Sequence, residues 1–230
     1  MDSVRALTIP GGWTERDVTV GDRTFHLLLP ANPDAFIEEL NEAELPTLPK
    51  MRSDPFWAQL WQAAEPLAKL VLEADWPGDT HVLELGCGSG LVGLAALSRG
   101  WRVTLSDYVP ESVELAVENA RRNGFSDARG LVLDWNEPIA ESFRVMVASD
   151  VLYDRRNHAP LLKTLDRMLP DDGVVWIGDA GRSGAADFFK VAPQRGYSIE
   201  PRDADGRPIA GPVNARFQWF IVRRARTTGS

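Results

Sequence analysis

Short apolar segments alternate with longer amphipathic ones from about residue 80 to the end of the chain. The apolar segments have the length of buried strands, and the amphipathic ones repeat their apolar residues with helical spacing. Strands are predicted over 81–85, 102–106, 130–133, 143–148, 174–178, 197–200 and 215–222, and helices over 91–99, 110–123, 185–194 and around the apolar stripe at 161–169. Strands that alternate with helices indicate a parallel sheet. No helix separates the last two strands, so these should pair antiparallel at one edge.

The first 80 residues follow a different pattern. Alternating polar and apolar residues over 17–29, with Gly21 at a turn, predict a β-hairpin. A short helix is predicted over 33–40, because Pro33 suits a first helical position. We therefore expect an N-terminal extension over residues 1–52 that packs on the core, a main α/β domain over 53–224 and a tail over 225–230.

Composition and charge narrow the kind of protein. A length of 230 residues favours one α/β domain with additions. A net charge of −8 argues against partners such as nucleic acid or an anionic membrane. Cys87 is the single cysteine and has no partner at metal-binding spacing, so we expect no disulfide, no metal and a reducing compartment. The first 30 residues do not resemble a signal peptide, and no apolar run approaches the ~18 residues of a membrane span. We expect a cytoplasmic monomer.

The stretch with the clearest chemistry begins at the strand predicted over 81–85. This strand runs into Gly86, Gly88 and Gly90, a helix follows at once, and the next strand ends in Asp107. Glycines let the backbone turn tightly and approach a ligand closely. The start of the helix offers free N–H groups, and an acid at the end of the next strand suits ribose hydroxyls. The stretch predicts a nucleoside site, although a glycine-rich turn can also join strand and helix without a ligand.

The spacing of the glycines distinguishes between nucleoside ligands. A dinucleotide site has its third glycine where this chain has Leu91. The pattern here is E-x-G-x-G-x-G, led by Glu84, and it resembles motif I of the class I S-adenosylmethionine methyltransferases. That ligand carries a sulfonium cation and no pyrophosphate, so the carboxylates of Glu84 and Asp107 suit it.

Three further segments make the resemblance more specific: Leu-Trp-Gln-Ala-Ala at 60–64, Leu-Asp-Trp at 133–135 and Ser-Asp-Val-Leu-Tyr at 149–153. Together they are similar to the protein lysine methyltransferases of the seven-strand group, whose bacterial relatives are often labelled nicotinamide-N-methyltransferase-like. Of these segments, the D-x-x-Y signature formed by Asp150 and Tyr153 is the most discriminating mark of that group. The resemblance covers about residues 53–222. It implies a Rossmann-like seven-stranded, mostly parallel sheet of order 3-2-1-4-5-7-6, with the last strand antiparallel and helices on both faces.

The resemblance also implies a role for each matching residue. Glu84, Gly86 and Gly88 would line the methionine part of S-adenosyl-L-methionine, and Asp107 would hold its ribose hydroxyls. The remaining expected cofactor residues are Asp134 and Trp135 at the adenine, Trp61 closing the pocket, and the adjoining Cys87, Tyr108 and Ser149, with Cys87 as a small inert filler.

Asp150 and Tyr153 are the predicted catalytic residues. Both follow the fourth parallel strand, at the edge where ligands meet in open α/β sheets. Methyl transfer is an in-line displacement, so the enzyme mainly orients two reactants. A carboxylate raises the pKa of a nearby amine, so Asp150 would position the amine, and Tyr153 would add a hydroxyl and an aromatic wall. The structural alternatives are a turn cap for Asp150, packing for Tyr153 and a turn acid for Asp134.

The predicted function is S-adenosylmethionine-dependent methylation of a protein lysine. The alternatives are methylation of a small-molecule amine or pyridine, a cofactor-binding protein without turnover, and a nicotinamide-dinucleotide oxidoreductase. Nucleic-acid and glutamine methyltransferases often carry N-P-P-[YF] where this chain has Ser-Asp-Val-Leu at 149–152, which argues against them. A protein substrate needs an open rim, for which the segments 17–29 and 202–213 are the candidates.

Overall fold

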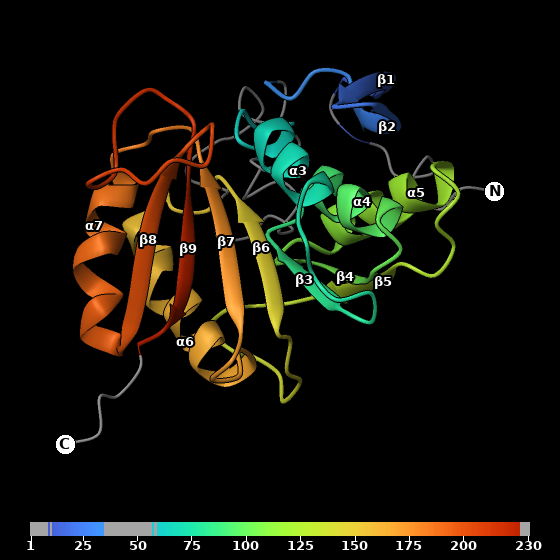
Figure 1. The fold of residues 1–230 in the computed structure, drawn as a ribbon. Helices are drawn as coiled ribbons and strands as arrows, with labels where there is room; N and C mark the ends of the chain where they lie inside the picture. Colours follow the sequence, from blue (N-terminus) through green and yellow to red (C-terminus); the bar gives the residue numbers. More distant parts are fainter. Residues whose placement is uncertain (1–8, 10, 35–56, 58, 226–230) are drawn as a thin grey trace, which may run out of the picture.

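The centre of the structure is a seven-stranded sheet (Figure 1). The computed structural model describes residues 9, 11–34, 57 and 59–225. The strands are β3 (His81–Leu85), β4 (Arg102–Asp107), β5 (Arg129–Val132), β6 (Val145–Ser149), β7 (Val174–Asp179), β8 (Tyr197–Asp203) and β9 (Gln218–Arg224). Their order is β5-β4-β3-β6-β7-β9-β8, in which only β9 runs antiparallel to its neighbours. This confirms the predicted order 3-2-1-4-5-7-6 and the antiparallel pair at the edge.

Helices cover both faces of the sheet, as predicted (Figure 1). One layer consists of α3 (Ala64–Leu72), α4 (Leu91–Ser98) and α5 (Pro110–Arg122), and the other of α6 (His158–Met168) and α7 (Gly184–Val191). The central strands β3, β4 and β6 are buried on both faces because each face packs against its own helices. Val82 and Val103 point toward the first layer, and Leu83 and Met146 toward the second.

The last strand is shorter than the predicted segment 215–222, because it begins only at Gln218. The side-chain amide of Gln218 accepts from Val213 N (2.8 Å) and donates to Val213 O (2.8 Å). These bonds hold the preceding residues in a loop, where Ala215 has a φ of 57°. A side-chain amide that hydrogen-bonds to both the N–H and the C=O of one residue takes the place of the backbone of a neighbouring strand.

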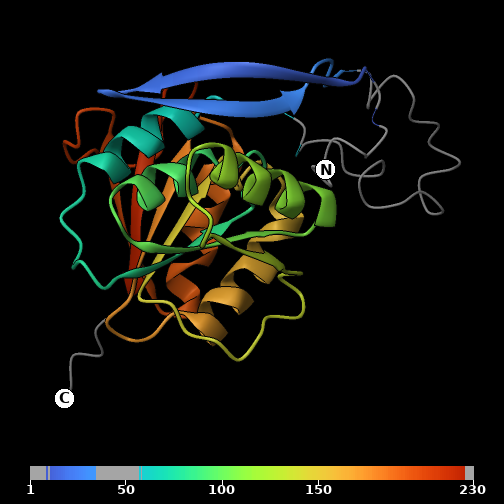
Figure 2. The same cartoon turned by 90° about the vertical axis from the view of Figure 1, so that its right-hand side faces the viewer.

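A two-stranded hairpin, β1 (Trp13–Val20) and β2 (Arg23–Pro30), lies across α3, α4 and α5 (Figure 2). It begins at Trp13 rather than at residue 17. Val18, Phe25 and Leu27 are buried in the core that these helices share. The helix predicted over 33–40 lies outside the described residues from residue 35 on, as do the boundary predicted at residue 52 and the tail beyond residue 225.

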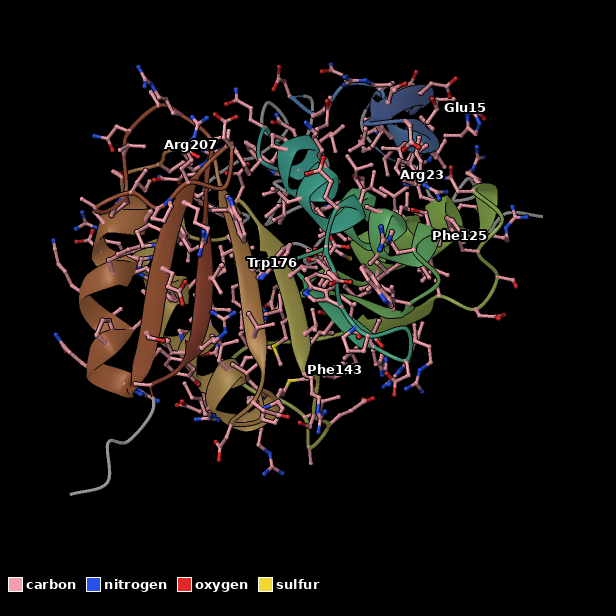
Figure 3. All side chains as sticks on the ribbon, in the orientation of Figure 1. Glu15, Arg23, Phe125, Phe143, Trp176 and Arg207 are labelled. Atoms are coloured by element: carbon pink, nitrogen blue, oxygen red, sulfur yellow. The ribbon has the colours of Figure 1, made fainter. Side chains whose placement is uncertain are left out.

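Aromatic side chains extend the core beside α3. The ring of Trp176 on β7 lies 4.7 Å from that of Trp76 and 4.8 Å from that of Trp219, measured between centroids (Figure 3). Large rings thus fill the part of this face that the nine-residue α3 leaves uncovered. Among the described residues, no helix has both the length and the apolar character that crossing a bilayer would require.

Candidate functional site

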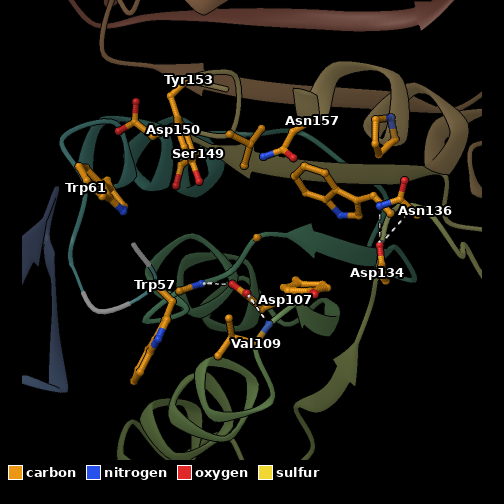
Figure 4. A pocket seen from close by; sticks show the side chains of 16 residues that line it. Trp57, Trp61, Asp107, Val109, Asp134, Asn136, Ser149, Asp150, Tyr153 and Asn157 are labelled. Atoms are coloured by element: carbon orange, nitrogen blue, oxygen red, sulfur yellow. Dashed lines mark hydrogen bonds between the residues drawn. The ribbon is translucent and has the colours of Figure 1, made fainter. Parts of the chain in front are cut away.

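A cavity of about 280 Å³ opens at the carboxyl ends of the parallel strands (Figure 4). Its lining residues come from several strand ends: Trp57, Trp61, Gly86, Gly88, Asp107, Tyr108, Val109, Asp134, Trp135, Asn136, Ser149, Asp150, Val151, Tyr153, Asn157 and Pro160. Ligands of open α/β sheets bind at this edge. Ten of the twelve predicted site residues line this cavity, all except Glu84 and Cys87.

The glycine-rich turn between β3 and α4 has the conformation that the sequence predicted. Gly86, Gly88 and Gly90 all have positive φ values, 65°, 50° and 82°. A Cβ on Gly90 would also lie 2.9 Å from that of Ala116 on α5. Only glycine meets both conditions, so the turn can lie directly against α5 while Gly86 and Gly88 face the cavity.

Asp107 ends β4 and lines the cavity beside this turn. Its Oδ2 accepts from Gly88 N (3.1 Å) and its Oδ1 from Val109 N (3.1 Å). Burial raises the pKa of Asp107, and these N–H donors oppose the rise. The carboxylate is therefore held in one orientation at the cavity wall, where hydroxyl groups of a ligand could donate to it.

The structure separates Glu84 and Cys87 from the other predicted cofactor residues. Neither is among the lining residues of the described chain. Glu84 is 1% exposed, its Oε2 accepts from Gly93 N (2.8 Å), and burial raises its pKa to about 8. Burial and the nearby Asp107 raise the pKa of the Cys87 thiol, which supports its expected inert role.

Gly93 is a residue that the sequence interpretation missed. A Cβ at this position would lie 2.6 Å from Glu84 Oε2 and 2.3 Å from the Leu105 side chain. Glycine therefore makes room in α4 for the buried carboxyl group. A glycine inside an otherwise apolar helix was the available signal, since glycine is unfavourable in a helix interior without a packing reason.

Asp134, Trp135 and Asn136 form one end of the cavity. Oδ1 of Asp134 accepts from the backbone N (2.8 Å) and the Nδ2 (3.0 Å) of Asn136. This is the turn-acid geometry that the sequence left open for Asp134. The residue nevertheless lines the cavity, and Asn136, which was not predicted as a site residue, lines it as well.

Asp150 connects three elements at the opposite end. Its Oδ2 accepts from Ala63 N (2.9 Å) just before α3, and its Oδ1 from Ala180 N (3.0 Å) just after β7. Arg182 Nε lies 3.5 Å from Oδ1, and the side chain of Asp150 is 1% exposed. The carboxylate is thus already engaged by protein groups, whereas Tyr153, three residues on, is 40% exposed.

Aromatic rings complete the wall near Asp150. The Arg182 guanidinium lies 4.9 Å from the ring centroid of Trp61, so it bridges Trp61 and Asp150. Trp57 also lines the cavity, although it packs in a cluster with Leu28 and Val109. In Figure 4, Trp61, Asp150 and Tyr153 lie on one side, and Asp107 and Val109 on another. Sequence reasoning had not predicted Val109, Asn157 and Pro160, which belong to no distinctive motif, or Val151, which lies within the segment 149–153 but had been given no role.

The charged residues that line the cavity, among those described, are all acidic. Asp107, Asp134 and Asp150 contribute carboxylates, and no residue of this lining within the described chain is Lys, Arg or His. Such a wall favours a cation over a pyrophosphate. In the described residues, no group of three or more His, Cys, Asp or Glu side chains could hold a metal ion.

The segments expected to form the rim of the cavity do not line it. No residue of 17–29 or 202–213 is among the lining residues. In the second segment, Asp203 Oδ1 accepts from Asp205 N and Arg207 N. These bonds close a turn over residues 203–207, at the end of β8.

Comparison with known proteins identifies relatives of this chain. A family model described as "Lysine methyltransferase" matches residues 47–194. A ribosomal protein L11 methyltransferase of Erwinia tasmaniensis is 34% identical over 122 residues, 51% of this chain and 41% of that protein. The chain therefore spans less than half the length of this curated relative.

Solved structures share the fold. A ribosomal protein L11 methylase of Lactobacillus delbrueckii subsp. bulgaricus superposes with a TM-score of 0.56 at 24% identity, covering 73% of this chain and 81% of that one. A TehB-like SAM-dependent methyltransferase of Corynebacterium glutamicum gives 0.58 at 23% identity, covering 80% and 100%. At these identities the likeness concerns the fold alone.

Proposed function

Since this chain belongs to the lysine methyltransferase family, we propose that it transfers the methyl group of S-adenosylmethionine to the side-chain amine of a protein lysine. The observation that carries the proposal is the cavity at the strand ends: its described lining residues include Asp107, Asp134 and Asp150 but no Lys, Arg or His, and only Asp150 is paired with a nearby arginine, Arg182. A sulfonium cation is favoured there by charge. The ribosomal-protein methyltransferases among the relatives are consistent with a protein as the acceptor.

The cavity residues divide between cofactor and acceptor. Asp107 would accept from the ribose hydroxyls, Gly86 and Gly88 would contact the methionine part, and Asp134, Trp135 and Tyr108, which also line the cavity, would surround the adenine. Trp61, Ser149 and Tyr153 border the place where the methyl group meets the amine. Bound S-adenosylmethionine supplies an electrophilic methyl carbon and leaves as S-adenosylhomocysteine when the C–S bond breaks. The protein orients the amine for in-line attack, and the amine proton passes to solvent.

The role of Asp150 in this scheme differs from the one that the resemblance implied. Its carboxylate accepts from two backbone N–H groups and is 1% exposed, so it positions the walls of the site. Tyr153 is the residue that contacts the acceptor. Its side chain is 40% exposed, and an open mouth at this residue suits a protein acceptor better than a small molecule. A cytoplasmic location and a monomeric state remain predictions from composition.

Transfer of label tests the proposal. The purified protein is incubated with S-adenosylmethionine labelled in its methyl group and, separately, with the protein and metabolite fractions of a cell extract. We expect label in methyl-lysine after hydrolysis of the protein fraction, and loss of transfer in an Asp107→Ala variant. Label confined to the metabolite fraction would assign the enzyme to small-molecule amines. A protein that binds S-adenosylhomocysteine but transfers no label would be a binding protein.

A further inference from the structure

One side-chain amide, that of Asn119, joins the N-terminal hairpin to the glycine-rich turn. Asn119 lies on α5 and is fully buried. Its Oδ1 accepts from Leu28 N (2.7 Å), and its Nδ2 donates to Leu28 O (3.1 Å) and to Ser89 O (3.0 Å). Leu28 belongs to β2 and Ser89 lies between Gly88 and Gly90, so three segments distant in sequence meet at this side chain.

Helix α5 supports the turn at two further points. Ser112 Oγ donates to Gly88 O (3.2 Å), and Gly90 lies against Ala116 too closely for any Cβ. On the other side, Gly88 N donates to Asp107. Side chains of α5 therefore bind the carbonyl oxygens of Gly88 and Ser89, and Asp107 binds the backbone N–H of Gly88.

The hairpin also contacts the wall of the cavity directly. Leu28 is 1% exposed and packs in one cluster with Trp57 and Val109. Both of these residues line the cavity. Displacement of β2 would therefore disturb the wall as well as the turn.

Asn123, the residue that caps the C-terminus of α5 four positions after Asn119, provides a comparison. Its Oδ1 accepts from His26 N (2.9 Å) and its Nδ2 donates to His26 O (2.9 Å). Residues four apart on a helix are about 6 Å apart, and residues two apart on a strand about 6.7 Å, so two amides can pair the edge of β2 as a neighbouring strand would. The remaining bond of Asn123 Nδ2 goes to Asn119 O in its own helix (2.8 Å), not to the turn.

We propose that Asn119 is a positioning residue of the cofactor site, through which the docked hairpin holds the glycine-rich turn in its ligand-binding conformation. The inference rests on the proposed function only in taking the cavity as the cofactor site. Coupling between two sites is reciprocal. If the hairpin stabilises the turn, a ligand at the turn must also stabilise the hairpin.

Titration with S-adenosylhomocysteine tests the proposal. Wild type, Asn119→Ala and Asn123→Ala are compared by calorimetry at a temperature where circular dichroism shows each protein fully folded, so global stability does not enter the affinity. We expect Asn119→Ala to raise the Kd about tenfold and Asn123→Ala to change it less than about twofold. Equal affinities of Asn119→Ala and wild type would overturn the inference and leave the proposed function intact. Absence of binding by wild type would overturn both.

Hydrogen exchange of the wild type provides a second measurement, which does not require the Asn119 variant to fold. With S-adenosylhomocysteine, we expect exchange to slow in the glycine-rich turn and in residues 26–29 of β2, where the Leu28 amide reports the Asn119 bond directly. The slowing should exceed that of β8 at the far edge of the sheet, which reports general stabilisation. Slowing confined to the turn would overturn the inference.

Discussion

Glu84 and Asp107 lie on adjacent parallel strands, yet they have opposite surroundings. Asp107 faces the cavity, whereas Glu84 is sealed under α4 by its bond to Gly93 N. The sequence predicted that both acids would lie near the turn, because the motif spacing defines the strand ends. It could not predict which would be buried, since a strand covered on both faces shows no polar–apolar alternation.

The buried Glu84 makes a prediction about pH. Burial raises its pKa in the folded protein from 4.5 to about 8. The folded state therefore binds the proton more tightly than the unfolded state, and this group lowers stability as pH rises from 4.5 to about 8, with no further change above. Glu84→Gln keeps an oxygen for Gly93 N and removes the titration. Between these pH values the free energy of unfolding should therefore fall more steeply with pH in wild type than in the variant, by up to about 1.4 kcal/mol per pH unit.

Urea unfolding of both proteins at about pH 5.5 and about pH 8.5 measures this difference. Asp107 and Cys87 also have raised pKa values, and their charges interact with that of Glu84, so the difference between the two proteins reports Glu84 together with this coupling. Parallel pH profiles for wild type and Glu84→Gln would show that the carboxyl group is not sequestered as described.

At the scale of elements, Asp150 connects the end of β6 with the start of α3 and the end of β7. Its φ of 53° is unusual for a residue other than glycine, although Asp and Asn tolerate it best. The sequence correctly predicted that Asp150 follows the fourth parallel strand, which is β6. Its hydrogen-bond partners lie 87 and 30 positions away, and no local pattern could reveal them.

Asp150→Ala should destabilise the fold as well as the reaction. It leaves the N–H groups of Ala63 and Ala180 without an acceptor, at about 1–3 kcal/mol for each buried group. Asp150→Asn retains one acceptor oxygen and tolerates the positive φ, so its loss should be smaller. Urea denaturation measures both, and Tyr153→Phe is the control, expected within about 0.5 kcal/mol of wild type because the side chain is 40% exposed. Unchanged stability of Asp150→Ala would restore a purely substrate-directed role for this carboxylate.

At the scale of the whole molecule, the topology could be predicted and the hairpin position could not. The alternation of strands and helices predicted a parallel sheet with an antiparallel pair at one edge, and the resemblance to the seven-strand methyltransferases supplied the strand order. The place of the hairpin depends on two side-chain amides of α5 and on buried apolar residues of β1 and β2. Since Leu28 and Asn119 are 91 positions apart, the contact could be found only in three dimensions. The convergence of Asp107, Asp134 and Asp150 on one cavity was predictable, because parallel strands end at the same edge.

A ligand that touches residues from Trp57 to Pro160 can bind only the folded chain. Such a ligand stabilises the fold by RT ln(1 + [L]/Kd), about 2.7 kcal/mol at a hundredfold excess over Kd. For a domain of this size we expect S-adenosylhomocysteine at that concentration to raise Tm by about 5–10 °C in a thermal unfolding scan. NADH at the same concentration should leave Tm unchanged, because its diphosphate would meet carboxylates, and none of the described lining residues is basic. A larger shift with NADH would favour the oxidoreductase alternative, since the two ligands differ in charge at the place where the wall is acidic.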